Sequence, residues 1–147
     1  ILTGATGTGK SYLAQALGHQ ACISMMKTLY FNTTRLMSHL KLSRLEGTYS
    51  KTMTLLEKAD LLILDDFGLT ALDNQHRQGL MDIVERKYDR SSIIISTQIP
   101  VTGWHDLIGE PTIADAILDR IVHSSHRIQL RGESMRKNKL KDKNEIN

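Results

Sequence analysis

Short apolar runs alternate with longer stretches of helical periodicity along this chain. Two of the runs, Leu61–Leu64 and Ile93–Ile95, are apolar without alternation, which is typical of strands covered on both faces. An alternation of strands and helices indicates βαβ units, so we expect an α/β fold around a parallel sheet. The predicted strands are Ile1–Thr3, Thr28–Asn32, Leu61–Asp65, Ser92–Thr97 and Arg127–Arg131.

The stretches between these runs have the spacing of amphipathic helices. In the stretch that begins at Asp73, that residue suits the N-cap, and Leu80, Ile83 and Val84 share one face. Pro111 suits the entry of the last helix. The predicted helices are Lys10–Cys22, Thr33–Leu45, Asp73–Asp89 and Thr112–His123, and the predicted loop is Gly47–Ser50.

Length and composition point to one ordinary globular domain. The chain has 147 residues, of which 40% are hydrophobic and 24% charged. No apolar run approaches the roughly 20 residues that span a bilayer, so we expect a cytoplasmic protein without membrane contact. The one cysteine, Cys22, lies in an apolar helical stretch and is expected to be a buried thiol in a reducing compartment.

Charge divides the chain into two parts. The net charge of +3 comes entirely from the residues after Leu130, so the domain surface is not broadly basic. We expect one folded domain over residues 1–131 and a basic, disordered tail over 132–147 that contacts nucleic acid or is merely solvated. Ile1–Thr3 has the pattern of a buried strand cut short, so we expect an upstream segment to be missing.

A complete phosphate-loop motif follows the first predicted strand. Residues Gly4–Ser11 read GATGTGKS and match G-x-x-x-x-G-K-[ST]. The glycines let backbone N–H groups point inward, and the following helix N-terminus favours phosphate. Lys10 is expected to reach the β- and γ-phosphates, and the Ser11 hydroxyl to bind Mg²⁺. We expect Tyr12 to be a packing group, with adenine contact as the alternative. The residues assigned to ATP binding are Gly4, Ala5, Thr6, Gly7, Thr8, Gly9, Lys10, Ser11 and Tyr12.

Two carboxylates end the third predicted strand. A charge at the tip of an apolar strand needs a partner, and in a parallel sheet that tip lies beside the phosphate loop. Asp65 is therefore expected to hold Mg²⁺ through its water shell, and Asp66 to polarise the water that attacks the γ-phosphate. The alternative is a simple turn into Gly68, which the neighbouring phosphate loop makes less attractive.

Two further polar features stay open on pattern alone. The fourth predicted strand ends in Ser96, Thr97 and Gln98, which either meet solvent or contact the γ-phosphate or the attacking water. Arg120, near the end of the last predicted helix, is either a surface charge or an arginine that reaches the γ-phosphate of a neighbouring subunit.

Taken together, the motifs resemble the IstB transposition-helper ATPases. The resemblance covers nearly the whole chain up to Lys137 and rests on GATGTGKSYLAQAL, LLILDDFG, IIISTQIPVTGWHDLIGEPTIADAILDRIVHSSHRIQL and GESMRK. These proteins are AAA+ P-loop ATPases, in the branch that also holds the DnaC-type helicase loaders. The resemblance implies a five-stranded parallel sheet flanked by helices. Only a short tail follows the last predicted strand, so we expect no full C-terminal helical lid, which departs from the broader AAA+ pattern.

The resemblance also implies roles and partners. It makes Gln98 the sensor at the tip of the fourth strand, with Thr97 as second choice, and Arg120 an arginine finger acting in trans. Arg136 becomes a residual sensor in the tail. Asp66 stands where glutamate is commoner in AAA+ proteins. The implied cofactors are ATP and Mg²⁺, and the implied partners are duplex DNA, further copies of the chain and a transposase.

Two other functions compete with this interpretation. A helicase loader would use the same chemistry with a replicative helicase as its partner. A small-molecule kinase would use the same phosphate loop, but Thr102–Thr112 holds no arginine or lysine of the kind found in a kinase lid.

Overall fold

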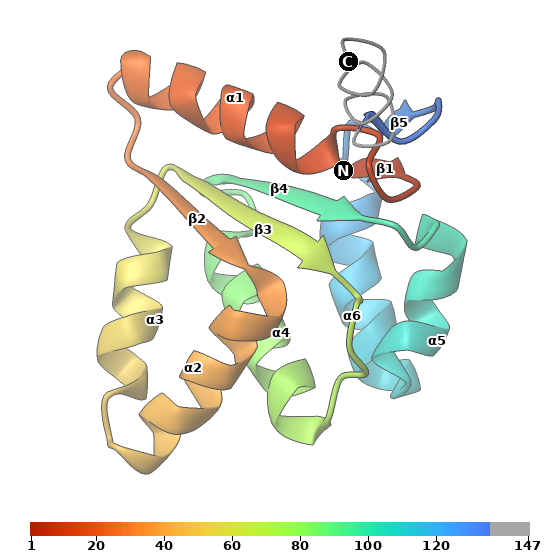
Figure 1. The fold of residues 1–147 in the computed structure, drawn as a ribbon. Coiled ribbons are helices and arrows are strands. Elements are labelled where there is room, and N and C mark those ends of the chain that lie inside the picture. The colour runs from red at the N-terminus through yellow and green to blue at the C-terminus, as the bar shows by residue number, and fades with distance from the viewer. Residues whose placement is uncertain (136–147) are drawn as a thin grey trace, which may run out of the picture.

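The chain folds around one parallel five-stranded sheet (Figure 1). The structure, a computed structural model, describes residues 1–135. The strand order is β2-β3-β4-β1-β5, and every pair of neighbours is parallel. The elements in chain order are β1 (Leu2–Gly4), α1 (Lys10–Ile23), β2 (Thr28–Asn32), α2 (Thr33–Leu45), α3 (Tyr49–Glu57), β3 (Leu61–Phe67), α4 (Asn74–Lys87), β4 (Ser92–Thr97), the 3₁₀ turn η1 (Val101–Gly103), α5 (Trp104–Ile108), α6 (Pro111–Val122) and β5 (Ile128–Leu130).

The five predicted strands and four predicted helices are all present, with small shifts at their ends. Asp73 caps α4 as expected, accepting a hydrogen bond from the His76 N–H. The sequence prediction missed α3 and α5 and placed Tyr49 and Ser50 in a loop, whereas both belong to α3. These two helices are short, at nine and five residues, so periodicity marks them weakly. Residues 136–147, which include most of the predicted tail and Arg136, lie outside the described residues.

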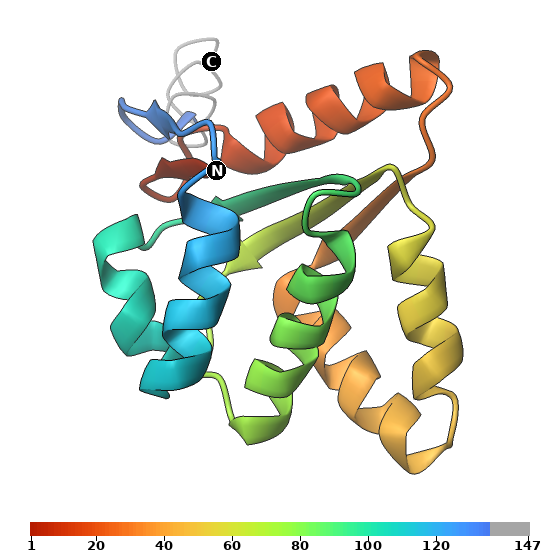
Figure 2. The same cartoon turned by 180° about the vertical axis from the view of Figure 1, so that it is seen from behind.

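Helices cover the two faces of the sheet unequally (Figure 2). Among the described residues, α1 lies alone on one face, while α2 to α6 lie on the other. Alternate residues of β3 point to opposite faces, as in any strand. Leu62 and Leu64 therefore join the large core under α2 to α6, and Leu61 and Ile63 join a small core under α1.

Small residues let α1 lie close to the sheet. Ala14, Gly18 and Ala21 form its buried stripe, together with Lys10. A Cβ on Gly18 would lie 2.7 Å from the Cδ1 atom of Ile63, so a larger residue there would force either that side chain or the helix to shift.

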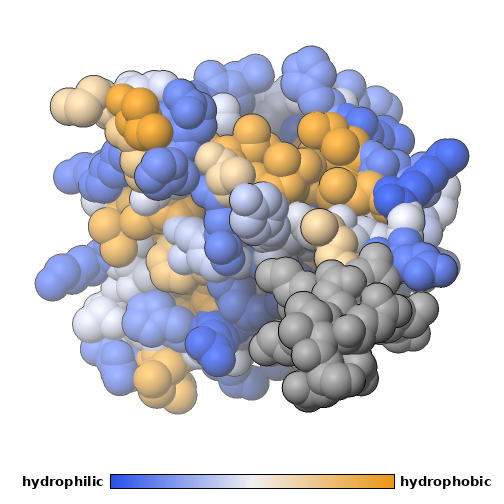
Figure 3. All heavy atoms as spheres, turned by 45° about the horizontal axis from the view of Figure 1, so that its top comes forward, coloured by the Kyte–Doolittle hydropathy of each residue, from blue (hydrophilic) through white to orange (hydrophobic). Residues whose placement is uncertain are grey.

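The outer side of α1 is open to solvent, and apolar side chains lie at the surface on this side of the molecule (Figure 3). Leu17 and Ile23 of α1 and Met25 just after it are all exposed. Cys22 is also exposed, so the prediction of a buried thiol was wrong. It follows Ala21 directly and therefore falls outside the narrow stripe that a single covering helix buries.

Candidate functional site

The phosphate loop forms the turn between β1 and α1. Gly7 and Gly9 have φ angles of 85° and 94°, in the left-handed region that favours glycine. Three contacts converge on the Ala5 carbonyl oxygen, because it accepts hydrogen bonds from Thr8 Oγ1, from the Thr8 N–H and from Lys10 Nζ. Lys10 is only 6% exposed, and its Nζ lies 2.8 Å from that oxygen. The loop is thus closed around its own lysine at the start of a helix.

Asp65 is a buried carboxylate that accepts several hydrogen bonds. It is 3% exposed and accepts from Ser96 Oγ, from Tyr30 Oη and from the Asp66 N–H at 3.0 Å. Burial alone would raise the pKa of Asp65, but the hydrogen bonds from Ser96, Tyr30, Ser11 and the backbone hold that pKa below its ordinary value. Asp65 is therefore an anion at neutral pH, and it is in contact with Ser11 of the phosphate loop.

Asp66 is held in an unusual backbone conformation. Its φ angle is 57°, a left-handed value that few non-glycine residues adopt, and the pairing of β3 with β4 is irregular between Leu64 and Phe67. The Asp66 carboxylate accepts a hydrogen bond of 3.1 Å from Asn32 Nδ2 at the tip of β2. The irregularity turns this second carboxylate toward the phosphate cleft instead of back into the sheet.

A single cleft of about 680 Å³ joins these groups. Its lining combines residues of the phosphate loop and the start of α1 with residues at or beyond the ends of β3, β4 and β5. They are Thr6, Gly7, Gly9, Lys10, Ser11, Tyr12, Asp66, Leu69, Gln98 and Met135. Gln98 Oε1 accepts a hydrogen bond of 2.7 Å from Thr6 Oγ1, so it stands at the phosphate loop. Thr97 is fully buried instead, where its hydroxyl donates to the Phe67 carbonyl oxygen at 2.7 Å. Of the two residues considered for the tip of β4, only Gln98 lines the cleft.

Tyr12 and Arg120 differ in their relation to the cleft. Tyr12 lines it and is 80% exposed, so the expectation that Tyr12 packs against the protein was wrong. Arg120 lies on α6, outside the residues that line the cleft. Its Nη1 donates to the Ala116 carbonyl oxygen at 2.8 Å, and its Nη2 lies 3.8 Å from Glu85 Oε1.

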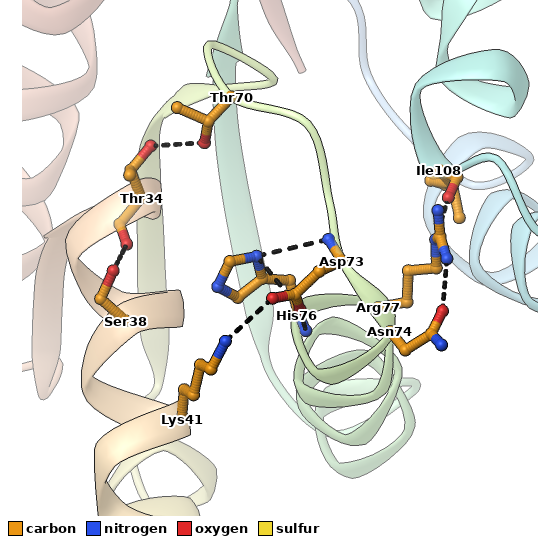
Figure 4. A network of polar contacts seen from close by, with 9 residues as sticks. All are labelled: Thr34, Ser38, Lys41, Thr70, Asp73, Asn74, His76, Arg77 and Ile108. Carbon is orange, nitrogen blue, oxygen red and sulfur yellow. Dashed lines mark hydrogen bonds and ion pairs between the residues drawn. The ribbon is translucent and has the colours of Figure 1, made fainter.

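The segment that follows Asp66 is anchored on both sides (Figure 4). Thr70 Oγ1 lies 3.2 Å from Thr34 Oγ1 of α2. Three residues later, Asp73 forms an ion pair of 3.1 Å with Lys41 of α2 and caps α4 through His76. The path of the chain beyond the second carboxylate is therefore tied to two helices.

Sequence reasoning did not predict that Tyr30, Asn32 and Ser96 hold the carboxylates, and it considered Ser96 only for contact with solvent, the γ-phosphate or the attacking water. Tyr30 Oη also accepts a hydrogen bond of 3.3 Å from Gln15 of α1. The alignment of neighbouring strands could have indicated these residues. Asn32 pairs with Asp65, and Ser96 follows Ile95, which pairs with Leu64, the residue before Asp65. Polar residues at the aligned tips of three strands meet at one edge of a parallel sheet.

The oxygens of Ser11 and Asp65 are ligands of the kind that Mg²⁺ prefers. Within residues 1–135, no cluster of three or more histidine, cysteine, aspartate or glutamate side chains is arranged as a metal site. A magnesium ion at this edge would therefore take most of its ligands from phosphate and water, as is usual when it accompanies a nucleotide.

Comparison with known proteins identifies the family. The sequence model for the IstB-like ATP binding protein family matches residues 1–143. The chain belongs to this IstB-like family. An insertion sequence ATP-binding protein of Sinorhizobium fredii (strain NBRC 101917 / NGR234), y4pL, is 50% identical over 137 residues, which cover 93% of this chain and 56% of that protein. The IS21 ATP-binding protein of Pseudomonas aeruginosa is 32% identical, over 97% of this chain and 53% of that protein. This IstB-like chain thus spans just over half the length of these curated relatives.

Solved structures support the same fold. AMPPCP-bound DnaA from Aquifex aeolicus aligns with 96% of the IstB-like chain and 44% of its own, at a TM-score of 0.75 and 20% identity. The DnaC helicase loader aligns with 88% of this chain and 76% of its own, at a TM-score of 0.71 and 22% identity. At this level of identity the likeness concerns the fold alone, which is that of P-loop AAA+ domains. Across the part of the chain that the structure describes, no helix has the length and apolar character needed to cross a membrane.

Proposed function

We propose that this chain hydrolyses ATP with Mg²⁺ and assists insertion-sequence transposition by ATP-dependent oligomerisation on duplex DNA. The observation that carries the proposal is the meeting of the phosphate loop with two carboxylates. Ser11 is hydrogen-bonded to Asp65, and Lys10 and Asp66 line one cleft. The names of the relatives, which associate them with insertion sequences, favour a transposase as the partner.

Each polar group of the cleft has a role in this proposal. The loop amides and Lys10 bind the β- and γ-phosphates, and Ser11 and Asp65 hold Mg²⁺. When bound, Mg²⁺ neutralises charge that develops on the phosphates. Asp66 orients the attacking water and accepts its proton. Gln98, held at the loop by Thr6, hydrogen-bonds the γ-phosphate or that water.

Arg120 completes the site from a second copy of the chain. It does not line the cleft of its own subunit, and its side chain is only partly exposed, at 30%. A role at the γ-phosphate therefore requires a neighbouring subunit, which would couple hydrolysis to oligomerisation. Gln98 and Arg120 would then approach the same phosphate from two subunits.

The test is an Arg120→Ala variant, followed by ATPase rate and particle size with and without duplex DNA. We expect ATP binding to remain, while DNA-dependent oligomerisation is lost and the ATPase rate falls on the order of a thousandfold. Arg86→Ala is the matched control, because Arg86 is also a partly exposed helical arginine with an ion pair, to Glu57 at 2.8 Å. Full ATPase activity and assembly in Arg120→Ala would overturn the role in trans.

A helicase loader is the second candidate, favoured by the fold that this chain shares with the DnaC helicase loader. The two candidates differ in partner and not in chemistry. Binding assays with an insertion-sequence transposase and with a replicative helicase separate them. Binding to the helicase alone would replace the transposition role.

A further inference from the structure

The residues after β5 return to the phosphate loop. We call Gly132–Met135 the strap. The Met135 N–H donates a hydrogen bond of 3.0 Å to the Gly7 carbonyl oxygen. Ser134 packs against Gly7 so closely that a Cβ on Gly7 would lie 2.1 Å from Ser134 Oγ. The end of the described chain is therefore fastened to the middle of the phosphate loop.

The Met135 side chain extends from the strap into the phosphate cleft. A Cβ on Gly9 would lie 3.5 Å from Met135 Sδ, which is ordinary van der Waals contact. Met135 lines the cleft yet is 61% exposed, so the protein itself covers less than half of it. Tyr12 is three residues after Gly9, which places it on the same side of α1, and it is 80% exposed. Two large side chains with apolar surface thus stand open beside Gly9.

This part of the cleft differs chemically from the rest of the lining. Lys10, Ser11, Asp66 and Gln98 offer charges and hydrogen-bonding groups, which suit phosphate and water. Met135 offers a flexible apolar thioether instead, and Tyr12 offers a flat aromatic ring. Both kinds of contact suit a nucleobase. The phosphates of a nucleotide fix its position at the loop, so its base must lie at another part of the same cleft.

We propose that Met135 and Tyr12 hold the base of the bound nucleotide, and that the hydrogen bond from the Met135 N–H to Gly7 positions Met135 for this contact. This inference rests on the proposed function, since it assumes that the cleft binds a nucleoside triphosphate. It adds a base-binding residue from outside the phosphate-loop motif and gives the strap a role in affinity.

The experiment compares ligands with and without a base. Titration calorimetry of the 147-residue chain measures the affinity of Mg–ATP, Mg–ADP and Mg–tripolyphosphate for the wild type and for Met135→Ala, Met135→Leu and Met135→Pro. We expect Met135→Ala to weaken ATP and ADP about two- to tenfold and to leave tripolyphosphate unchanged. Met135→Leu should restore most of the loss. Met135→Pro lacks the N–H donor to Gly7, so it should weaken all three ligands.

Each outcome of these titrations tests one part of the proposal. If Met135→Ala leaves ATP affinity unchanged, or weakens ATP and tripolyphosphate equally, the base contact is wrong. If Met135→Pro behaves like Met135→Ala, the hydrogen bond to Gly7 has no role in binding. If the wild type binds tripolyphosphate but gains nothing from the base of ATP, the inference fails while the phosphate site stands. If the wild type binds neither ligand, the proposed function itself fails.

Discussion

The two faces of the sheet are built for different tasks. Within residues 1–135, the face under α2 to α6 holds a core of 17 buried residues, whereas the face under α1 holds five. The phosphate loop is attached to the thinly covered face, through α1. The strength of the fold and the proposed chemistry are thus largely carried by different parts of one sheet, and a substitution can be placed to affect one more than the other.

The largest expected effect comes from the same substitution made on each face. Leu36→Ala removes a side chain that is 1% exposed in the large core, so the free energy of unfolding should fall by about 2–5 kcal/mol. Leu17→Ala, on α1, removes a side chain that is 39% exposed and should cost less than about 1 kcal/mol. Urea unfolding followed by the fluorescence of Trp104, the one tryptophan, measures both. Equal losses would show that the faces contribute alike.

Two buried lysines, Lys87 of α4 and Lys10 of the phosphate loop, allow a second comparison between the two faces. Lys87 Nζ donates to the carbonyl oxygens of Leu56 at 3.1 Å and Ala59 at 2.7 Å, and burial lowers the pKa of Lys87. Lys87→Met leaves both oxygens without this donor, so unfolding free energy should fall by about 1–3 kcal/mol while ATP affinity is unchanged. Lys10→Met should instead lower ATP affinity by about tenfold or more.

Denaturation and nucleotide titration on the same samples give both quantities. The comparison between the faces is contradicted if Lys10→Met destabilises the protein as much as Lys87→Met does.

A smaller effect is expected at the hydrogen bond between Asn32 and Asp66. Asn32→Ser removes the amide donor to Asp66 but keeps an oxygen able to cap α2, so stability should hold. Turnover should fall about tenfold at unchanged ATP affinity, because Asp66 loses the group that orients it. Asn74→Ser is the control, since Asn74 Oδ1 accepts a hydrogen bond of 2.6 Å from Arg77 Nη1 on α4 and does not line the cleft. Steady-state kinetics measures turnover separately from the apparent affinity for ATP. Equal turnover in the two variants would show that Asn32 has no role in catalysis.

The smallest expected effect is a loss of stability at alkaline pH, caused by Tyr49 on the face that α2 to α6 cover. Burial and a hydrogen bond to Asp82 raise the pKa of Tyr49 from 10.0 to about 12. A raised pKa in the folded state adds stability that is fully present below pH 10 and is lost as the pH rises toward 12. The difference in unfolding free energy between wild type and Tyr49→Phe should therefore shrink over this interval. A difference that stays constant from pH 9 to pH 12 contradicts this account.

The sequence predicted the sheet well because its strands are short apolar runs with clear ends. The helices α3 and α5 were missed because they are short, and because α5 follows directly on a 3₁₀ turn. The motif residues of the phosphate loop and the carboxylates were found because their chemistry is tied to local spacing. The contacts of Tyr30 and Ser96 with Asp65 were not predicted, because they depend on register between strands that are about 30 residues apart in the chain.

Hydroxyl groups from β2 and β4 meet the Asp65 carboxylate on β3, so three strands must align before this edge exists. A slip of one residue in either pairing would turn a contributing side chain to the opposite face. A misfolded molecule would then lack the site altogether, instead of having a site with reduced turnover. Loss of activity through misfolding should therefore appear as fewer binding sites per mole of protein, each with normal affinity. Stoichiometric titration counts the sites, and so distinguishes misfolding from a local defect in a site that has formed.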